Sequence, residues 1–136
     1  MTIQDRITLL GPGQKQTVNF YGTVAPFSAQ VLVSPIFARP FHIYLVRPHF
    51  ALNQNRTLQL SFYAALDNSE SSALPLSGTN LLQQSSLTTY AVGDDESKDI
   101  FLDFWQFEGN GFIKVYANNT DGHLHTIDCQ IFIEIF

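Results

Sequence analysis

Two histidines near the end of the chain have the spacing of a metal site. His123 and His125 are two residues apart, so on a β-strand both side chains point to the same side, as two ligands of one zinc or nickel ion must. A third ligand is not evident, although Asp121, His42 or His49 could approach in space. Metal sites need three or four ligands with supporting contacts. The alternative is that both rings cover the open end of a hydrophobic core.

A second group of possible ligands is acidic. Asp94, Asp95, Glu96 and Asp99 offer the oxygen atoms that calcium prefers. The segment lacks the glycine and the ligand spacing of an EF-hand loop, so a solvated hairpin turn is favoured and calcium is the alternative. We therefore assign no metal to either group of residues and expect no cofactor.

The chain shows no catalytic motif. It has many serines, but no Gly-x-Ser-x-Gly sequence and no Cys/His/Asn pattern stands out. Gly11–Lys15 lacks the spacing of a phosphate-binding loop, and a β-rich chain offers no helix to follow it. The single cysteine, Cys129, falls on the apolar side of a predicted strand and is expected to be a buried free thiol. We predict that the protein is not an enzyme.

Aromatic side chains are abundant, with twelve Phe, five Tyr and one Trp. Such residues dominate cores and subunit interfaces, and these are the favoured roles. The alternative is a platform for a sugar ring, with the candidates Trp105, Phe107, Tyr44, Tyr63, Tyr90 and Tyr116.

Asp103 shares a predicted strand face with Phe101, Trp105 and Phe107. This carboxylate is expected either at the surface of an apolar interface or paired with a cation such as Lys114 or Arg47.

β-Strands must position these residues. In residues 123–136 apolar side chains recur at every second position, a period that fits a strand with one buried face and does not fit a helix. Similar alternation recurs upstream, and Gly, Pro or Asn turn signals separate the segments. We expect eight or nine strands, at 17–24, 30–34, 41–50, 58–66, 87–92, 100–107, 112–117 and 123–136, with a further short apolar segment at 7–10.

Within the segment 41–50, the alternation places Phe41, Ile43 and Leu45 on one face and His42, Tyr44 and Val46 on the other.

This number of strands in one domain, residues 1–136, predicts an all-β fold. An antiparallel β-sandwich of the jelly-roll or another Greek-key type suits it. The connection 67–86 has no period, and its length fits a Greek key better than a meander. We expect this connection to be a functional or mobile loop, with Leu81 and Leu82 in a short helical turn.

Charge limits the partners. The net charge of −5 and the lack of a basic stripe argue against nucleic acid and against a membrane surface as partners.

No signal-peptide pattern opens the chain and no apolar run could span a bilayer, so a cytoplasmic or virion location is expected. Only 14% of residues are charged, below the roughly 25% of typical domains. We expect the remaining apolar surface to be buried in a symmetric homo-oligomer.

In size, strand count and lack of catalytic motifs, the chain resembles the single jelly-roll proteins that decorate or build virus and bacteriophage particles. The resemblance covers most of the chain and is one of architecture. It implies a trimer or higher assembly that packs on a capsid protein, with the 67–86 loop and the 93–99 turn exposed.

By the same resemblance, the contact surfaces would be the aromatic faces around Phe41 and Tyr44 and around Phe101, Trp105 and Phe107. The alternative function is a carbohydrate-binding β-sandwich with an aromatic platform and a structural calcium. A third is a cupin-like metalloenzyme built on His123 and His125.

Overall fold

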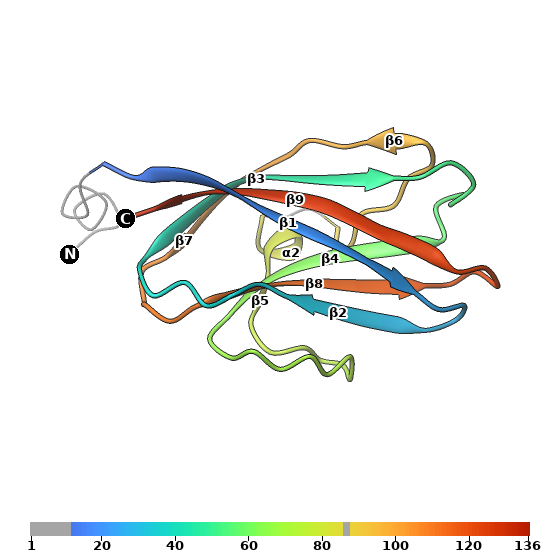
Figure 1. The fold of residues 1–136 in the computed structure, drawn as a ribbon, viewed down its shortest axis with the longest axis horizontal. Coiled ribbons are helices and arrows are strands. Elements are labelled where there is room, and N and C mark those ends of the chain that lie inside the picture. Colours follow the sequence, from blue (N-terminus) through green and yellow to red (C-terminus); the bar gives the residue numbers. More distant parts are fainter. Residues whose placement is uncertain (1–11, 86–87) are drawn as a thin grey trace.

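Two antiparallel β-sheets packed face to face make up the computed structural model, which describes residues 12–85 and 88–136 (Figure 1). The strands are β1 (Gln14–Val24), β2 (Ala29–Val33), β3 (Phe41–Phe50), β4 (Leu58–Ala65), β5 (Thr79–Asn80), β6 (Glu96–Ser97), β7 (Ile100–Gln106), β8 (Phe112–Asn119) and β9 (His125–Ile135). A short helix, α2 (Leu81–Gln84), follows β5.

The strand order is that of a jelly roll. In the first sheet β9 lies between β1 and β3, and β3 also pairs with β6 and β7 on its other edge; the second sheet has the order β2–β8–β4–β5. Early strands thus pair with late ones in nested fashion: β1 with β9, β2 with β8, β3 with β7 and β4 with β5. This nesting places two Greek keys in one sandwich. The predicted all-β antiparallel sandwich is confirmed.

The core lies between the inward faces of the two sheets. Strands alternate their side chains between faces, so most residues at every second position of β9, β4 and β8 are fully buried. These residues are Ile127, Cys129, Ile131, Ile133, Leu58, Leu60, Phe62, Ile113, Val115 and Ala117. Cys129 is a buried free thiol as predicted, and loss of solvation raises the pKa of this thiol above its ordinary value.

The alternation changes phase within β3. Ile43 pairs with Ile133 and Leu45 with Phe132, so Tyr44 is an extra residue that forms a β-bulge. Beyond the bulge, Val46 enters the core cluster, whereas Leu45 lies outside it. The expected placement of Leu45 and Val46 was therefore wrong, because a bulge depends on strand pairing and leaves no mark in the local period.

The segment predicted as a strand at 87–92 is not one in its described part. Ala91 forms an isolated bridge with Leu60, and the Ser61 hydroxyl donates a hydrogen bond to the Thr89 carbonyl at 2.9 Å. Residue 87 lies outside the described residues. The segment runs beside β4 and is fixed there by these few contacts.

The predicted helical turn at Leu81 and Leu82 is confirmed as α2. The Asn80 side chain caps it by accepting a hydrogen bond from the Gln83 N–H at 3.1 Å. Both leucines are buried against the core.

A buried lysine fastens the connection between β4 and β5 to the second sheet. Lys114 projects from the outer face of β8, yet its side chain is only 2% exposed. Its Nζ donates to Asp67 Oδ1 at 2.7 Å and to Ser77 Oγ at 2.9 Å. Asp67 Oδ1 also accepts a hydrogen bond from the Ser77 hydroxyl at 2.9 Å. The hydrogen bonds that Asp67 accepts from Lys114 and Ser77 lower its pKa to about 2. The loop is exposed, as expected, but both of its ends are held on the sheet.

Replacing Asp67 with Asn should destabilise the protein by about 1–2 kcal/mol at pH 7, because the buried ammonium of Lys114 loses its anionic partner. Since folding lowers the pKa of Asp67, the stabilisation is present above the ordinary value of 3.8 and is lost as the pH falls toward about 2. Urea denaturation at several pH values measures the difference. Glu70→Gln, an exposed carboxylate of the same loop, is the control; equal effects of both variants would contradict the prediction.

Candidate functional site

A histidine, a tryptophan and two carboxylates meet on the outer face of the first sheet. His42 of β3 lies opposite Trp105 of β7 and opposite Glu134 of β9. The two rings stack, with centroids 4.2 Å apart and planes 13° apart. Asp103 Oδ1 lies 2.7 Å from His42 Nε2 and accepts a hydrogen bond from the Trp105 indole at 3.0 Å. The sheet register thus builds a polar centre within an aromatic surface.

Aromatic rings extend from this centre along the sheet. Phe107 and Phe136 contact Trp105 at centroid distances of 5.8 and 5.2 Å, and Tyr44 lies 6.2 Å from His42 and 6.4 Å from Phe132. We call this set the aromatic strip; it consists of His42, Tyr44, Trp105, Phe107, Phe132 and Phe136.

Cations border the aromatic strip. Lys15 Nζ lies 5.7 Å from the Tyr44 ring centroid, and the Arg47 guanidinium lies 5.0 Å from that of Phe132. Phe101, opposite Leu45 on the same sheet, is 74% exposed. The outer face of this sheet therefore presents aromatic area to the surroundings.

Four of the five predicted interface residues lie on this face. Tyr44, Trp105 and Phe107 belong to the aromatic strip, and Phe101 lies beside it. Phe41 does not: its side chain is fully buried in the core, 5.3 Å from the Phe37 ring. Phe41 points inward because it shares a strand phase with Ile43, so its assignment to a contact surface is corrected.

Asp103 pairs with neither predicted cation. Lys114 binds Asp67 on the other sheet, and Arg47 binds Asp99 at 2.6 Å. The Arg47 hydrogen bond lowers the pKa of Asp99. Asp103 is instead an exposed carboxylate held by His42 within the apolar surface, and the sequence could not show this because the two residues are far apart along the chain.

The six candidate sugar-platform residues do not form one surface. Tyr63 and Tyr116 belong to β4 and β8 of the second sheet, and Tyr90 belongs to the segment beside β4. Near the end of β7, however, Trp105 and Phe107 line a groove of about 430 Å³. The polar side chains that line this groove are Asp67, Thr79, Gln106 and Glu108.

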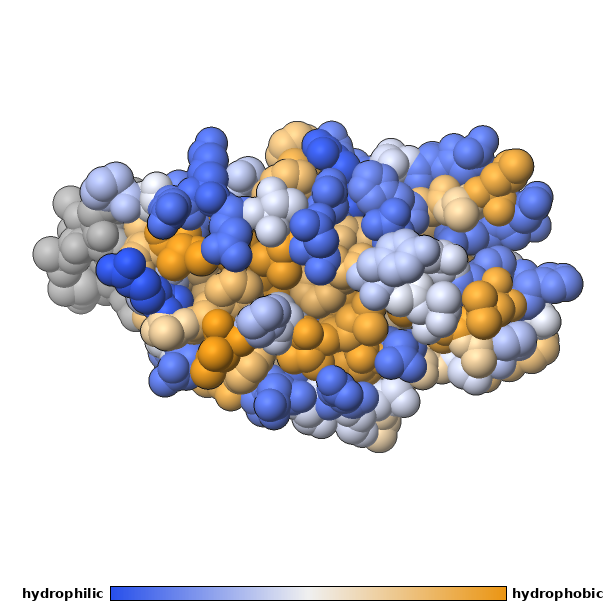
Figure 2. Space-filling view, in the orientation of Figure 1, coloured by the Kyte–Doolittle hydropathy of each residue, from blue (hydrophilic) through white to orange (hydrophobic). Residues whose placement is uncertain are grey.

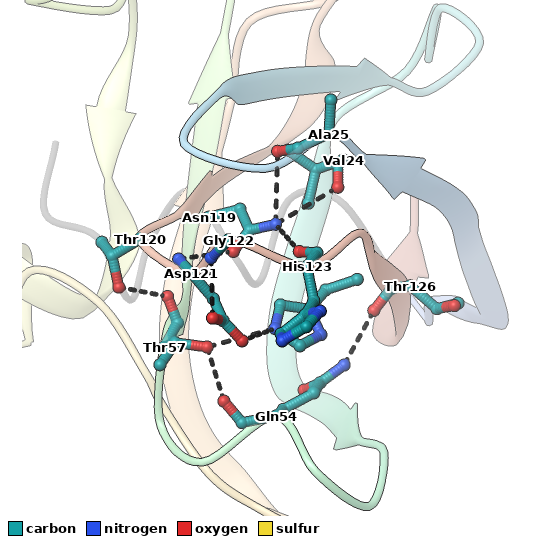
Figure 3. A network of polar contacts seen from close by, with 11 residues as sticks. Val24, Ala25, Gln54, Thr57, Asn119, Thr120, Asp121, Gly122, His123 and Thr126 are labelled. Carbon is teal, nitrogen blue, oxygen red and sulfur yellow. Dashed lines mark hydrogen bonds and ion pairs between the residues drawn. The ribbon is translucent and has the colours of Figure 1, made fainter.

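His123 and His125 do not share a strand face. β9 begins at His125, whereas His123 lies exposed in the preceding turn (Figure 3). His125 is buried, with Nε2 2.9 Å from Asp121 Oδ2 and 3.2 Å from Thr57 Oγ1. The hydrogen bond from His125 lowers the pKa of Asp121. The prediction that His123 and His125 point to the same side of a strand was wrong, because the strand starts two residues later than predicted.

The acidic segment forms part of the first sheet rather than a compact cluster. Glu96 belongs to β6, which pairs with the end of β3, and Asp99 is engaged by Arg47. Asp94 and Asp95 lie in the turn before β6. Within residues 12–85 and 88–136, no three His, Cys, Asp or Glu side chains lie close enough together to hold a metal ion.

Asn119 joins two turns at one end of the sandwich. Its buried Nδ2 donates to the carbonyls of Val24, Ala25 and His123 at 3.3, 3.2 and 2.7 Å, and its Oδ1 accepts from the Asp121 N–H at 2.9 Å (Figure 3). The network of His125, Asp121 and Asn119 is thus a structural clamp between the β1–β2 and β8–β9 turns.

A hydrophobic band runs along one side of the molecule. Figure 2 shows it between β1 and the connection from β2 to β3, where a groove of about 570 Å³ is lined by Val18, Ile36, Phe37 and Ile135 among others. The local sequence did not predict this groove, because strand β1 and the connection between β2 and β3, which are separate in the sequence, form it together. Across the described residues, no helix has the length and hydrophobicity needed to cross a bilayer.

No family model matches the sequence, and no curated protein matches it either. Solved structures match by fold. The VP2 subviral particle of infectious bursal disease virus aligns with a TM-score of 0.51 and 7% identity over 92% of this chain and 33% of that chain. The T=1 particles derived from infectious bursal virus align with a TM-score of 0.50 and 5% identity over 92% and 32%. The capsid of cyanophage Pam1 aligns with a TM-score of 0.42 and 14% identity over 91% and 86%.

This chain thus spans about a third of the length of the bursal virus chains that it matches. At such low identity the likeness is one of fold. The predicted resemblance in architecture to viral capsid proteins is confirmed.

Asn119→Ala should lower the free energy of unfolding by about 2–3 kcal/mol, because carbonyls of two turns lose their donor in a buried site. Asn118→Ala is the matched control, since Asn118 is half-buried and donates to Gln59 Oε1 at 3.2 Å; a loss below about 1 kcal/mol is expected there. Urea denaturation of both variants measures the difference. Similar losses in the two variants would show that Asn119 is not a clamp.

Proposed function

We propose that this protein is a non-enzymatic structural component of a virus or bacteriophage particle, a decoration or minor capsid protein that assembles as a homotrimer. The observation that carries the proposal is the aromatic strip on the outer face of a sheet. In an antiparallel sandwich this face normally meets water and is polar. Aromatic side chains and Arg are enriched at the cores of subunit interfaces. The jelly-roll fold shared with viral capsid proteins supports the same function.

The two sheets differ in how their outer faces are covered. On the second sheet, the chain's own 66–78 loop covers Lys114 and holds it at 2% exposure. On the first sheet Phe101 stays 74% exposed beside the aromatic strip. An apolar face that the described part of the chain leaves uncovered is a suitable contact surface for another subunit.

Charges around the aromatic strip suit contacts between identical subunits. Lys15 and Arg47 provide positive charge, and Asp103 and Glu134 provide negative charge on the same face. Opposite charges on one surface let two copies pair them across an interface. A cyclic trimer closes such a heterologous contact, and its remaining faces would pack on a capsid protein in the virion.

Carbohydrate binding is the second candidate function, favoured by the groove at the end of β7. The aromatic residues Trp105 and Phe107 line this groove beside the polar residues Gln106 and Glu108, and sites for small ligands combine apolar and polar groups in this way. A panel of immobilised glycans tests it. Binding that persists in the monomer and is lost in both Trp105→Ala and Glu108→Ala would support this function over assembly.

Phe101→Asp should shift the protein from trimer to monomer at micromolar concentration, because a carboxylate would be buried in the proposed interface. Phe27→Asp is the matched control, since Phe27 is 75% exposed in the turn between β1 and β2, away from the aromatic strip. Light scattering measures the mass of the unmodified protein and both variants. A monomeric unmodified protein would overturn the proposal, and loss of the trimer in both variants would overturn the choice of surface.

A further inference from the structure

His42 lies between two carboxylates in the middle of the aromatic strip. Its Nε2 is 2.7 Å from Asp103 Oδ1, and its Nδ1 is 3.6 Å from Glu134 Oε1. Nδ1 is buried and has no hydrogen-bond partner within the described residues. A neutral imidazole carries one proton and can donate to only one carboxylate, whereas an imidazolium donates from both nitrogens. Only the imidazolium form of His42 could donate toward both Asp103 and Glu134.

The charges that face His42 come from three strands. β7 contributes Asp103 and β9 contributes Glu134. β1 contributes Lys15, which lies opposite Glu134 in the strand register and whose Nζ is 5.7 Å from the Tyr44 ring centroid. Farther along β3, Arg47 is paired with Asp99. With His42 neutral, the two carboxylates and the one ammonium leave a net charge of −1; with His42 protonated, the group is neutral.

Burying this surface against another subunit would remove these charges from water. An uncompensated carboxylate is costly to bury, and a neutral, hydrogen-bonded group is much less so. Histidine is the side chain that ordinarily gains its proton between pH 8 and 5. We propose that association through the aromatic strip takes up one proton at His42, so that assembly tightens as the pH falls across this range. This inference rests on the proposed function and adds its regulation.

The test is the dissociation constant of the assembly between pH 8 and pH 5.5 at fixed ionic strength, measured by sedimentation equilibrium. Uptake of one proton makes the dissociation constant of each subunit contact fall by up to about tenfold for each pH unit. His42→Gln should abolish this dependence. Glu134→Gln should weaken it and tighten assembly at pH 8, because it removes the uncompensated charge.

His49→Gln is the matched control. His49 lies on the same face of β3, but its ring is hydrogen-bonded to Ser97 and lies outside the aromatic strip; this variant should keep the full pH dependence. A dissociation constant that does not change with pH, or an unchanged dependence in both His42→Gln and Glu134→Gln, would overturn the inference and leave the proposed assembly intact. A monomer at every pH would instead overturn the proposed function itself.

Discussion

The burial of one face of β9 is the interaction on which the rest of this structure depends. β9 pairs with β1 along its whole length and with β3 on its other side. Its inward residues Ile127, Ile131 and Ile133 are fully buried against the second sheet. Burial of each such side chain contributes about 1.5–3 kcal/mol. Strand β9 therefore holds β1 and β3 on its two sides and fixes the strand order of the first sheet.

Because a strand alternates its side chains, the same burial decides what the sheet shows outside. Once Ile131 and Ile133 point inward, Phe132 and Glu134 must point outward. The bulge at Tyr44 keeps that ring on the outer face while Val46 returns to the core. The outward position of the aromatic strip is therefore a consequence of how the core residues of the same strands pack.

The two outer faces of the sandwich have different chemistry for a physical reason. A lysine on the second sheet is covered by a loop because Asp67 and Ser77 supply the hydrogen bonds that its ammonium needs when buried. On the first sheet, no loop within residues 12–85 and 88–136 covers Phe101 in this way, and the polar centre at His42 has an exposed carboxylate partner in Asp103. The outer face of the second sheet is thus covered at Lys114 by a loop of the same chain. In the function proposed above, the outer face of the first sheet would be covered by another subunit.

The sequence by itself determined the features that depend on local period and residue type. These are the antiparallel strands, the sandwich, the buried Cys129 and the helical turn at Leu81. Only the tertiary structure decided which phase each strand takes and which distant residues meet. Phe41 lies in the core, His123 and His125 do not share a strand face, and Asp103 contacts His42. These outcomes depend on strand register, on the bulge in β3 and on where β9 begins. All three arise from pairing between segments that are far apart in the chain.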